Sequence, residues 1–272
     1  MGSKKKNLLV RIASALVLLP LVLVMLGIGG LPFALLVAAA AAVTVTEILG
    51  IVGLSRCHPA ALVSMAAAAA LVLFAAGGSP DWTTIAAILG LAPFVVFSLL
   101  TLRPPASDLR RAAEAAAWAT AAVPYAGLLA AVVLLRDLPQ GLGWTMLALA
   151  MTWGNDTGAY FAGLFFGKRK LYPKVSPNKT WEGFFGGLAS SILACVIASF
   201  FLPLGLADVL ILGGVAGVVG PLGDLSESLI KRAYGVKDSG HIIPGHGGLF
   251  DRIDALLFVA PWTLAYLSLF LG

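Results

Sequence analysis

The sequence predicts an all-α, polytopic integral membrane protein. Hydrophobic residues make up 60% of the 272 positions and charged residues only 11%, and the mean hydropathy is +0.97. Apolar runs of about 20 residues, long enough to cross a bilayer as a helix, recur along the chain. No internal repeat or low-complexity tail divides the sequence, so we expect a single membrane domain over residues 1–272.

Gly, Pro and charged residues separate these apolar runs into about nine predicted membrane helices. In chain order they cover residues 10–28, 31–54, 60–77, 83–102, 113–135, 143–166, 182–203, 207–230 and 252–271. The first apolar run is long, and no small-x-small cleavage signal follows it. We therefore expect a retained span rather than a cleaved signal peptide.

The basic residues predict the orientation of these spans. With a cytoplasmic N-terminus, all of the 18 Lys and Arg residues except Arg136 fall on the cytoplasmic side or at its membrane edge. The C-terminus is then outside, and the long polar connections 167–181 and 231–251 share the cytoplasmic face. Because the basic residues lie between apolar runs rather than on one patch, the net charge of +5 does not indicate nucleic-acid binding. We expect a multi-pass membrane protein with its site on the cytoplasmic side.

Chemistry-bearing residues concentrate in the second half of the chain. Residues 1–142 predict mostly scaffold spans, whereas residues 143–272 predict catalytic spans and cytoplasmic loops. Glu47 in the second span is an exception. We expect it to make a helix-to-helix hydrogen bond or to pair with a basic residue, with a direct role in the site as the alternative. Cys57 and Cys195 lack the paired spacing of a zinc site or disulfide framework.

The sixth span and the connection after it carry two candidate elements. Asp156 lies deep in the span, so it should face a wet cavity or a partner inside the bundle, with a structural hydrogen-bonded pair as the alternative. Tyr160 is one turn later on the same face. The connection then supplies two hydroxyls, an amide and an ammonium just before a helix expected to begin near Trp181, which favours phosphate binding by Ser176, Asn178, Lys179 and Thr180. The earlier basic run 168–170 is better explained by topology or anionic lipid headgroups.

The eighth span is broken by several glycines and Pro221. Because Pro221 removes a helix hydrogen bond, we expect a kink there. Beyond Pro221, helical spacing predicts one polar face that points toward the cytoplasmic mouth and is formed by Asp224, Glu227, Ser228 and Lys231. The alternative interpretation is that these residues form internal ion pairs, such as Asp224 with Lys231.

The last polar stretch predicts an anion site and a metal ligand. Closely spaced glycines around His246 can turn successive N–H groups inward, and His246 can donate to a phosphate. Asp251 opens the last helix, where capping is the alternative role for it and for Asp254. Two hard carboxylates that reach a common mouth, Asp224 and Asp251, suit Mg²⁺, which completes its shell with water and phosphate oxygens.

Residues 228–254 resemble the signature of the phosphatidate cytidylyltransferases, also called CDP-diglyceride synthetases. The positions that match are Ser228, Lys231, Arg232, Lys237, Asp238, Gly240, Pro244, His246, Gly247, Gly248, Asp251, Arg252 and Asp254. Residues 156–160 and 176–183 also look like features of this family, so the resemblance extends over about 145–272.

The resemblance implies an integral enzyme of the cytoplasmic (inner) membrane that acts in phospholipid biosynthesis. It forms CDP-diacylglycerol and pyrophosphate from CTP and phosphatidic acid. The resemblance also implies a requirement for Mg²⁺, the use of K⁺ as a second cation, and a homodimer. On this hypothesis Asp224 and Asp251 hold the metal, and phosphatidic acid enters from the inner leaflet with its acyl chains still among membrane lipids. The phosphate-binding or catalytic residues would be Ser176, Lys179, Lys231, Arg232, Lys237 and His246, and the other substrate-binding residues would be Asp156, Tyr160, Asn178, Thr180, Ser228, Gly247, Gly248 and Arg252.

Two other functions fit parts of the pattern. One is a CTP-dependent polyprenol kinase, or a cytidylyltransferase for another lipid phosphate. The other is a transporter for an anionic metabolite, which a broken eighth span would favour.

Overall fold

The computed structural model describes residues 2–78, 93, 95 and 109–271. Within this part of the chain it confirms the predicted all-α, multi-pass membrane class, because seven helices are long and apolar enough to cross a membrane. These candidate spans are Val10–Ile28, Gly30–Ile51, Pro59–Ala76, Ala113–Asp137, Trp181–Ala198, Leu206–Ala233 and Phe250–Leu271. The predicted span 83–102 lies outside the described residues except at positions 93 and 95, which are helical. The total of nine spans and the orientation of the termini stay predictions.

The predicted span 143–166 is a helix but is not one of these seven. It forms α7 (Gly141–Phe166). The polar run from Asn155 to Thr157 lies inside it and lowers its mean hydropathy.

The described residues pack as two compact units. The first unit comprises Met1–Val133 and Val236–Arg252, and the second comprises Leu134–Gly235 and Ile253–Gly272. The prediction of a single membrane domain stays untested, and each unit is described by itself.

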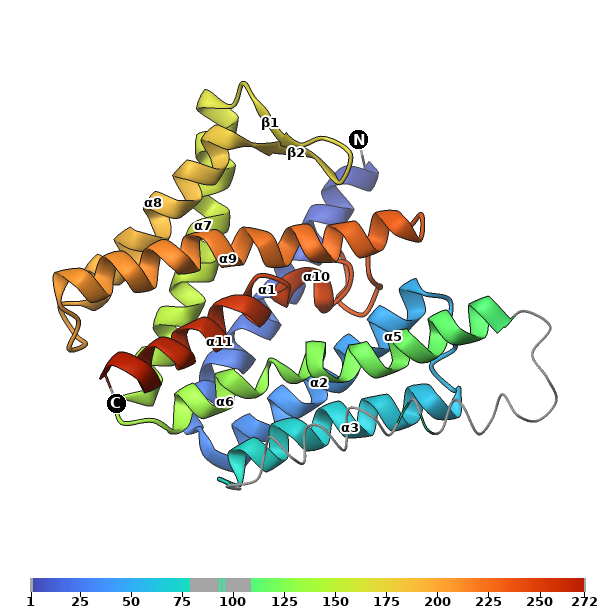
Figure 1. Ribbon diagram of the computed structural model, residues 1–272. Coiled ribbons are helices and arrows are strands. Elements are labelled where there is room, and N and C mark those ends of the chain that lie inside the picture. The colour runs from blue at the N-terminus through green and yellow to red at the C-terminus, as the bar shows by residue number, and fades with distance from the viewer. Residues whose placement is uncertain (1, 79–92, 94, 96–108, 272) are drawn as a thin grey trace. The chain divides into compact units, whose positions relative to one another are not determined.

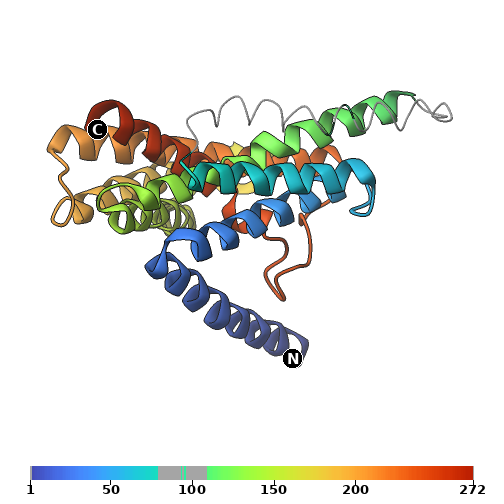
Figure 2. The ribbon, with the colours of Figure 1, turned by 90° about the horizontal axis from the view of Figure 1, so that it is seen from below.

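The first unit is an alanine-rich helical packet. Its helices are α1 (Gly2–Ile28), α2 (Gly30–Ile51), α3 (Pro59–Ala76), α5 (Leu109–Gly127) and the start of α6 (Ala130–Asp137). α3 and α5 approach closely enough for the Ser64 hydroxyl to donate to the Ala119 carbonyl at 2.9 Å. Figure 2 shows α1 leaving this packet, and its apolar side chains, such as Leu16 and Val17, are largely exposed. Such a surface suits contact with lipid.

The second unit is built on α7, α8 (Trp181–Ala198), α9 (Leu206–Ala233) and α11 (Leu256–Tyr266), with a π-helical turn at Leu267–Leu271. The short α10 (Phe250–Ile253) crosses the boundary between the units. In Figure 1, α7 and α8 run side by side with a β-hairpin at one end.

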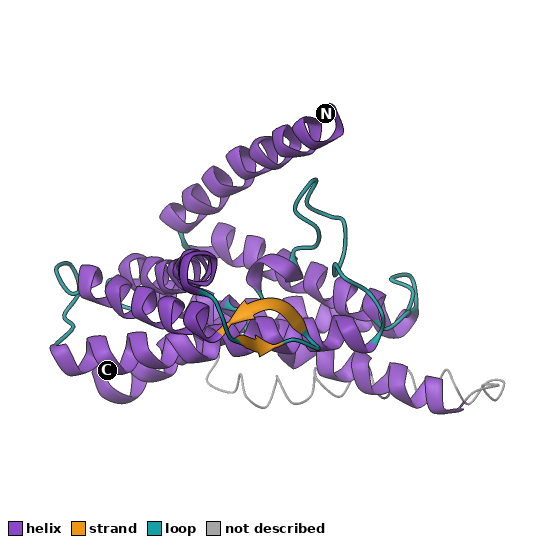
Figure 3. Cartoon of the chain, turned by 90° about the horizontal axis from the view of Figure 1, so that it is seen from above, coloured by secondary structure: helices purple, strands orange, loops and turns teal. Residues whose placement is uncertain are grey.

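This hairpin is the exception to the all-α prediction. Strands β1 (Lys170–Tyr172) and β2 (Ser176–Thr180) pair antiparallel, with Lys170 opposite Thr180 and Tyr172 opposite Ser176. Figure 3 shows these two strands among the helices. The predicted helix start at Trp181 is confirmed, and the Thr180 hydroxyl caps that helix by accepting from Gly183 N at 3.1 Å.

Glycines allow α8 to pack closely against both of its neighbours. A Cβ at Gly187 would lie 2.8 Å from Asn155 Oδ1 of α7, and a Cβ at Gly217 of α9 would lie 2.9 Å from Leu188 Cα. Asn155 then ties the three helices together, since its amide donates to Ser191 Oγ at 3.1 Å and to the Gly217 carbonyl at 3.2 Å. Small residues and interhelical hydrogen bonds of this kind stabilise helix packing inside membranes.

The expectation that the eighth span is broken is wrong, whereas the kink expected at Pro221 stays a prediction. α9 is one uninterrupted helix that passes through Pro221. Gly213 and Gly217 face α8, while Gly220 and Gly223 face the segment around Asp254 to Val259. These glycines therefore serve close packing and do not mark a break.

Alanine at Gly158 should destabilise the second unit. Its Cβ would meet the Ser190 side chain and lie 2.7 Å from the Gly186 carbonyl oxygen, so we expect the free energy of unfolding to fall by about 1–3 kcal/mol. The control is Gly214→Ala on α9, where no neighbouring atom of the described residues lies within 4 Å of the new Cβ. That variant should be neutral or more stable by up to about 1 kcal/mol. Thermal unfolding in detergent compares them, and equal midpoints for Gly158→Ala and wild type would contradict the packing argument.

Candidate functional site

Three carboxylates converge in the second unit. Asp224 and Glu227 come from α9, and Asp254 follows α10. One oxygen of each lies within 4.8 Å of the others, with Glu227 buried and the two aspartates half-buried. Gly223 allows this approach, because a Cβ there would lie only 2.6 Å from the Asp254 carbonyl oxygen. Such a group of hard oxygen donors can hold a divalent cation.

Two lysines accompany the carboxylates. Lys179 Nζ lies 2.6 Å from Asp224 Oδ2, and Lys231 Nζ lies 2.8 Å from Glu227 Oε2. The Ser228 hydroxyl donates to Asp224 Oδ1 at 3.2 Å. Asp224 and Ser228 thus pair on α9, and the alternative of internal ion pairs is met by Glu227 and Lys231. Lys179 is brought to Asp224 from the hairpin. That this face points toward the cytoplasmic mouth stays a prediction. Ammonium groups beside a carboxylate cluster are suited to an anion that arrives with a metal ion.

Asp156 lies on α7 of the same unit, and its side chain is exposed. Tyr160, one turn further, is 65% exposed, and its ring meets Phe161 edge-on at 5.4 Å. Whether either residue lines a substrate cavity stays a prediction.

The carboxylate of Glu182 fixes the hairpin that carries Lys179. Glu182 in the first turn of α8 accepts from Lys168 N at 3.1 Å and from Arg169 N at 3.2 Å. Arg232 at the end of α9 donates to the Val175 carbonyl in the hairpin turn at 3.4 Å. The Glu182 bonds therefore tie the hairpin to α8, and the Arg232 bond ties its turn to the end of α9.

The four residues predicted to bind phosphate take different positions in this hairpin. Ser176 is half-buried on β2 and Asn178 is exposed there, whereas Thr180 caps α8. Lys179 has the most direct connection to the carboxylate cluster.

Asp251 lies in the first unit, where a loop holds it. Asp251 Oδ2 accepts from Gly248 N at 2.9 Å, from Ser239 N at 3.1 Å and from the Ser239 hydroxyl at 3.0 Å. Asp224 belongs to the second unit, so joint metal binding by Asp224 and Asp251 stays a prediction.

Glu47 meets the same loop from α2. Its Oε1 accepts from Leu249 N at 3.0 Å, and its Oε2 accepts from Phe250 N at 2.7 Å and from the Ser239 hydroxyl at 3.2 Å. The side chain is buried, with 6% exposure. The expected helix-to-helix hydrogen bond is present, but its donors are backbone N–H groups at the start of α10 and in the loop before it.

The predicted glycine-rich turn is present, and backbone N–H groups next to it donate hydrogen bonds to the side chains of Asp251 and Glu47. Gly245 and Gly247 have φ of 76° and 87°, a conformation that favours glycine. The next N–H groups, from Gly248 to Phe250, donate to Asp251 and Glu47. His246 Nδ1 lies 2.9 Å from Ser14 Oγ on α1. Lys237 and Arg252 are exposed.

Three acidic residues were not among the predicted site residues. Glu227 had a local signal, because it lies one helical turn after Asp224 on the same face. Asp254 matches the family signature, but its place beside Asp224 and Glu227 depends on the return of the chain at α10, which local spacing does not indicate. Glu47 had only the signal of a carboxylate inside an apolar helix.

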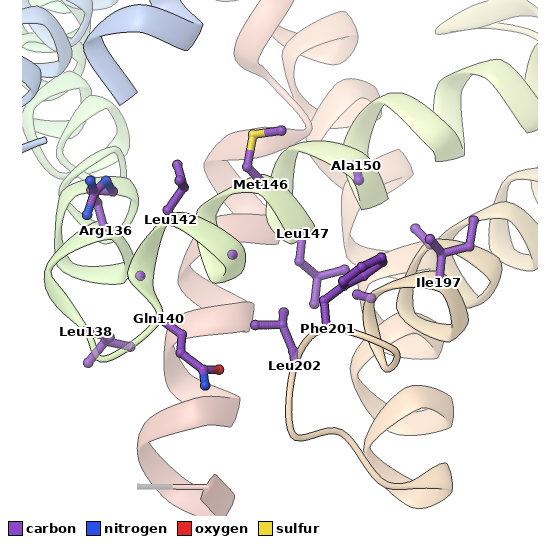
Figure 4. A pocket seen from close by; sticks show the side chains of 14 residues that line it. Arg136, Leu138, Gln140, Leu142, Met146, Leu147, Ala150, Ile197, Phe201 and Leu202 are labelled. Carbon is purple, nitrogen blue, oxygen red and sulfur yellow. The ribbon is translucent and has the colours of Figure 1, made fainter. Parts of the chain in front are cut away.

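A separate apolar pocket of about 800 Å³ lies in the second unit (Figure 4). Its lining comes from the end of α6, the first turns of α7, the end of α8 and the turn after α8. The residues are Arg136, Leu138, Gln140, Gly141, Leu142, Gly143, Met146, Leu147, Ala150, Ala194, Ile197, Ala198, Phe201 and Leu202. None of the predicted site residues lines it.

Comparison with known proteins gives one consistent result. The model of a family described as the cytidylyltransferase family matches residues 9–270. A Bacillus subtilis (strain 168) protein named phosphatidate cytidylyltransferase is 37% identical over 281 residues, which cover 99% of this chain and 100% of that protein. A Staphylococcus epidermidis protein of the same name is 36% identical over 261 residues, which cover 94% of this chain and 96% of the relative.

The buried pair Glu227–Lys231 should show strong energetic coupling. The side chains are only 2% and 10% exposed, so a double-mutant cycle with Glu227→Gln and Lys231→Met should give a coupling free energy of about 1–3 kcal/mol. Arg110–Glu114 has the same i,i+4 spacing but is 88% and 46% exposed, and its cycle should give about 0.5 kcal/mol or less. Unfolding in detergent measures both cycles, and equal coupling in the two pairs would contradict the role of burial.

Proposed function

Because this chain belongs to the cytidylyltransferase family, we propose that it acts as a phosphatidate cytidylyltransferase, forming CDP-diacylglycerol and pyrophosphate from CTP and phosphatidate. The observation that carries the proposal is similarity along nearly the whole chain to bacterial proteins of that name. The carboxylate cluster with its two lysines supports it, because a nucleotidyl transfer between two anions needs both metal ligands and cations.

The donor set of the second unit fits Mg²⁺. Asp224, Glu227 and Asp254 offer carboxylate oxygens alone, and Mg²⁺ is bound by one or two carboxylates together with water and substrate phosphates. When bound, Mg²⁺ would offset negative charge on the triphosphate. Asp251, predicted from the sequence as a ligand with Asp224, remains a candidate. K⁺ as a second cation remains a proposal from the family resemblance.

In the proposed reaction, a phosphate oxygen of phosphatidate attacks the α-phosphorus of CTP. A new P–O bond forms, the bond from the α-phosphorus to the bridging oxygen breaks, and pyrophosphate leaves with that electron pair. A phosphate nucleophile is already ionised at neutral pH, so no general base is required. The protein's contribution is therefore positioning and charge stabilisation.

Cationic side chains are assigned to the triphosphate in this proposal. Lys179 and Lys231 lie beside the carboxylate cluster, so each can contact phosphate oxygens of a nucleotide bound there. Lys237 is exposed in the loop of the first unit, and Arg232 and His246 complete the assigned set.

The proposal places the site on the cytoplasmic side of an inner membrane. The basic connections around the hairpin and after α9 favour that side, where CTP is available. Phosphatidate would reach the site from the inner leaflet while its acyl chains stay in the bilayer. The homodimer expected from the family resemblance is part of this proposal.

Purified protein should release pyrophosphate from CTP only when phosphatidate is present. Asp224→Asn should lower kcat at least about 100-fold, since it removes a proposed metal ligand. Asp208→Asn is the matched control on the same helix, because Asp208 accepts from Gly205 N and from the Tyr266 hydroxyl at the opposite end of α9. It should keep near wild-type activity per folded molecule.

Product analysis separates the rival functions in the same assay. CDP release would indicate a lipid kinase, and flux in proteoliposomes without turnover would indicate a transporter. Wild-type activity in Asp224→Asn would refute the metal assignment.

Removing divalent cations should abolish activity, and adding Mg²⁺ should restore it. Mg²⁺ should also raise the thermal unfolding midpoint of the wild-type protein, because a ligand that binds only the folded state stabilises it. Asp224→Asn should lose this thermal shift, whereas Asp208→Asn should keep it. Equal shifts in wild type and Asp224→Asn would place the cation elsewhere.

A further inference from the structure

Glu47 makes bonds that a helix does not need for its own stability. Both carboxylate oxygens accept backbone N–H groups, from Leu249 at 3.0 Å and from Phe250 at 2.7 Å. The Ser239 hydroxyl adds a third contact at 3.2 Å. The acceptor is on α2 and the donors lie about 200 positions later, so these bonds fix a distant loop.

The loop is shaped to fit this carboxylate. A Cβ on Gly240 would lie 2.7 Å from Glu47 Oε1, and a Cβ on Gly248 would lie 2.7 Å from Glu47 Oε2. Both glycines are therefore needed for the close approach of the loop backbone. With 6% exposure, the carboxylate also depends on these donors to offset the cost of its burial.

The segment held in this way carries candidate site residues. Lys237 and Asp238 precede Ser239, and Asp251 follows Phe250 directly. Ser239 and Gly248 donate to Asp251 as well. Glu47 and Asp251 therefore hold the loop from its two sides, and the conformation of residues 237–251 depends on both.

We propose that Glu47 is a positioning residue for triphosphate binding: its carboxylate holds residues 239–250 in the conformation that presents Lys237 and Asp251 to CTP. This inference rests on the proposed function for its kinetic consequence. Its structural part, the fixing of the loop by Glu47, does not depend on that function.

Glu47→Gln is the sharpest test, because it keeps the size of the side chain. Both oxygens of Glu47 accept an N–H, so either orientation of the amide turns its NH₂ toward a backbone donor. The loop should loosen, and hydrogen–deuterium exchange should become at least about tenfold faster in the peptide covering residues 239–250. Exchange in residues 206–223 of α9 should stay at the wild-type rate.

Kinetics distinguish positioning from a general loss of structure. If only a fraction of molecules holds the loop in its binding conformation, the apparent KM for CTP rises by the inverse of that fraction. We expect an increase of about tenfold in the KM for CTP and a change of less than about threefold in the KM for phosphatidate. Loss of folded protein would instead lower kcat and leave both KM values unchanged.

Two further variants complete the experiment. Thr44→Ala is the control on α2, since the Thr44 hydroxyl is buried and donates to Ala40 O in its own helix; loop exchange and both KM values should match wild type. Ser239→Ala is the milder variant in case Glu47→Gln does not fold. It removes one donor to Glu47 and should shift exchange and the KM for CTP in the same direction by a smaller factor.

Each outcome decides the proposal. Faster loop exchange with a selective rise in the KM for CTP supports it. Unchanged exchange in Glu47→Gln overturns it, and so does faster exchange with unchanged KM values. If wild-type protein releases no pyrophosphate from CTP and phosphatidate, the proposed function fails, and the exchange data alone decide whether Glu47 fixes the loop.

Discussion

Burying a carboxylate in an apolar helical protein is costly unless a donor reaches it, and the folding of this chain provides such donors at defined points. Glu47 receives N–H groups from the start of α10, and Asp208 receives the Tyr266 hydroxyl at 2.7 Å. In both cases the donor lies far away in the sequence, so the position of an acidic residue specifies which distant segment packs against it. Glu227 instead accepts a hydrogen bond from Lys231 of its own helix, so it does not require a donor from a distant segment for that bond. The packing of distant segments in this protein is therefore coupled to the hydrogen bonding of its acidic side chains.

The second unit meets this constraint with a rigid frame. Glycines bring α7, α8 and α9 together at backbone distance, and Asn155 bonds to both of the other helices. Large side chains at these seams would move the helices apart and would also move the hairpin that presents Lys179. The tight seams thus position a cation relative to the carboxylates of α9, although no glycine contributes a functional group itself. Flexible side chains would hold this geometry less well, because they can change rotamer.

Local patterns predicted the features that local physics determines. The apolar runs indicated membrane helices, the change from a polar connection to an apolar run indicated a helix start near Trp181, and helical spacing indicated the polar face of α9. The strands of the hairpin were missed because they are short and polar. The partners of the carboxylates could not be predicted, since Lys179 reaches Asp224 and Asp254 joins Glu227 only through tertiary packing. The glycines of α9 were interpreted as a break because glycine occurs both at helix breaks and at close helix contacts, and the sequence alone does not distinguish the two.

Ser239 has a single hydroxyl hydrogen, yet its oxygen lies 3.2 Å from Glu47 Oε2 and 3.0 Å from Asp251 Oδ2. One hydrogen cannot make two full hydrogen bonds at once, so the two carboxylates compete for it. A ligand bound to Asp251 would weaken the hydrogen bond from Ser239 to Asp251, so the Ser239 hydroxyl could donate its hydrogen fully to Glu47. Rotation of the Ser239 hydroxyl about its Cβ–Oγ bond would therefore couple ligand binding at Asp251 to the hydrogen bond that Glu47 of α2 makes with the loop.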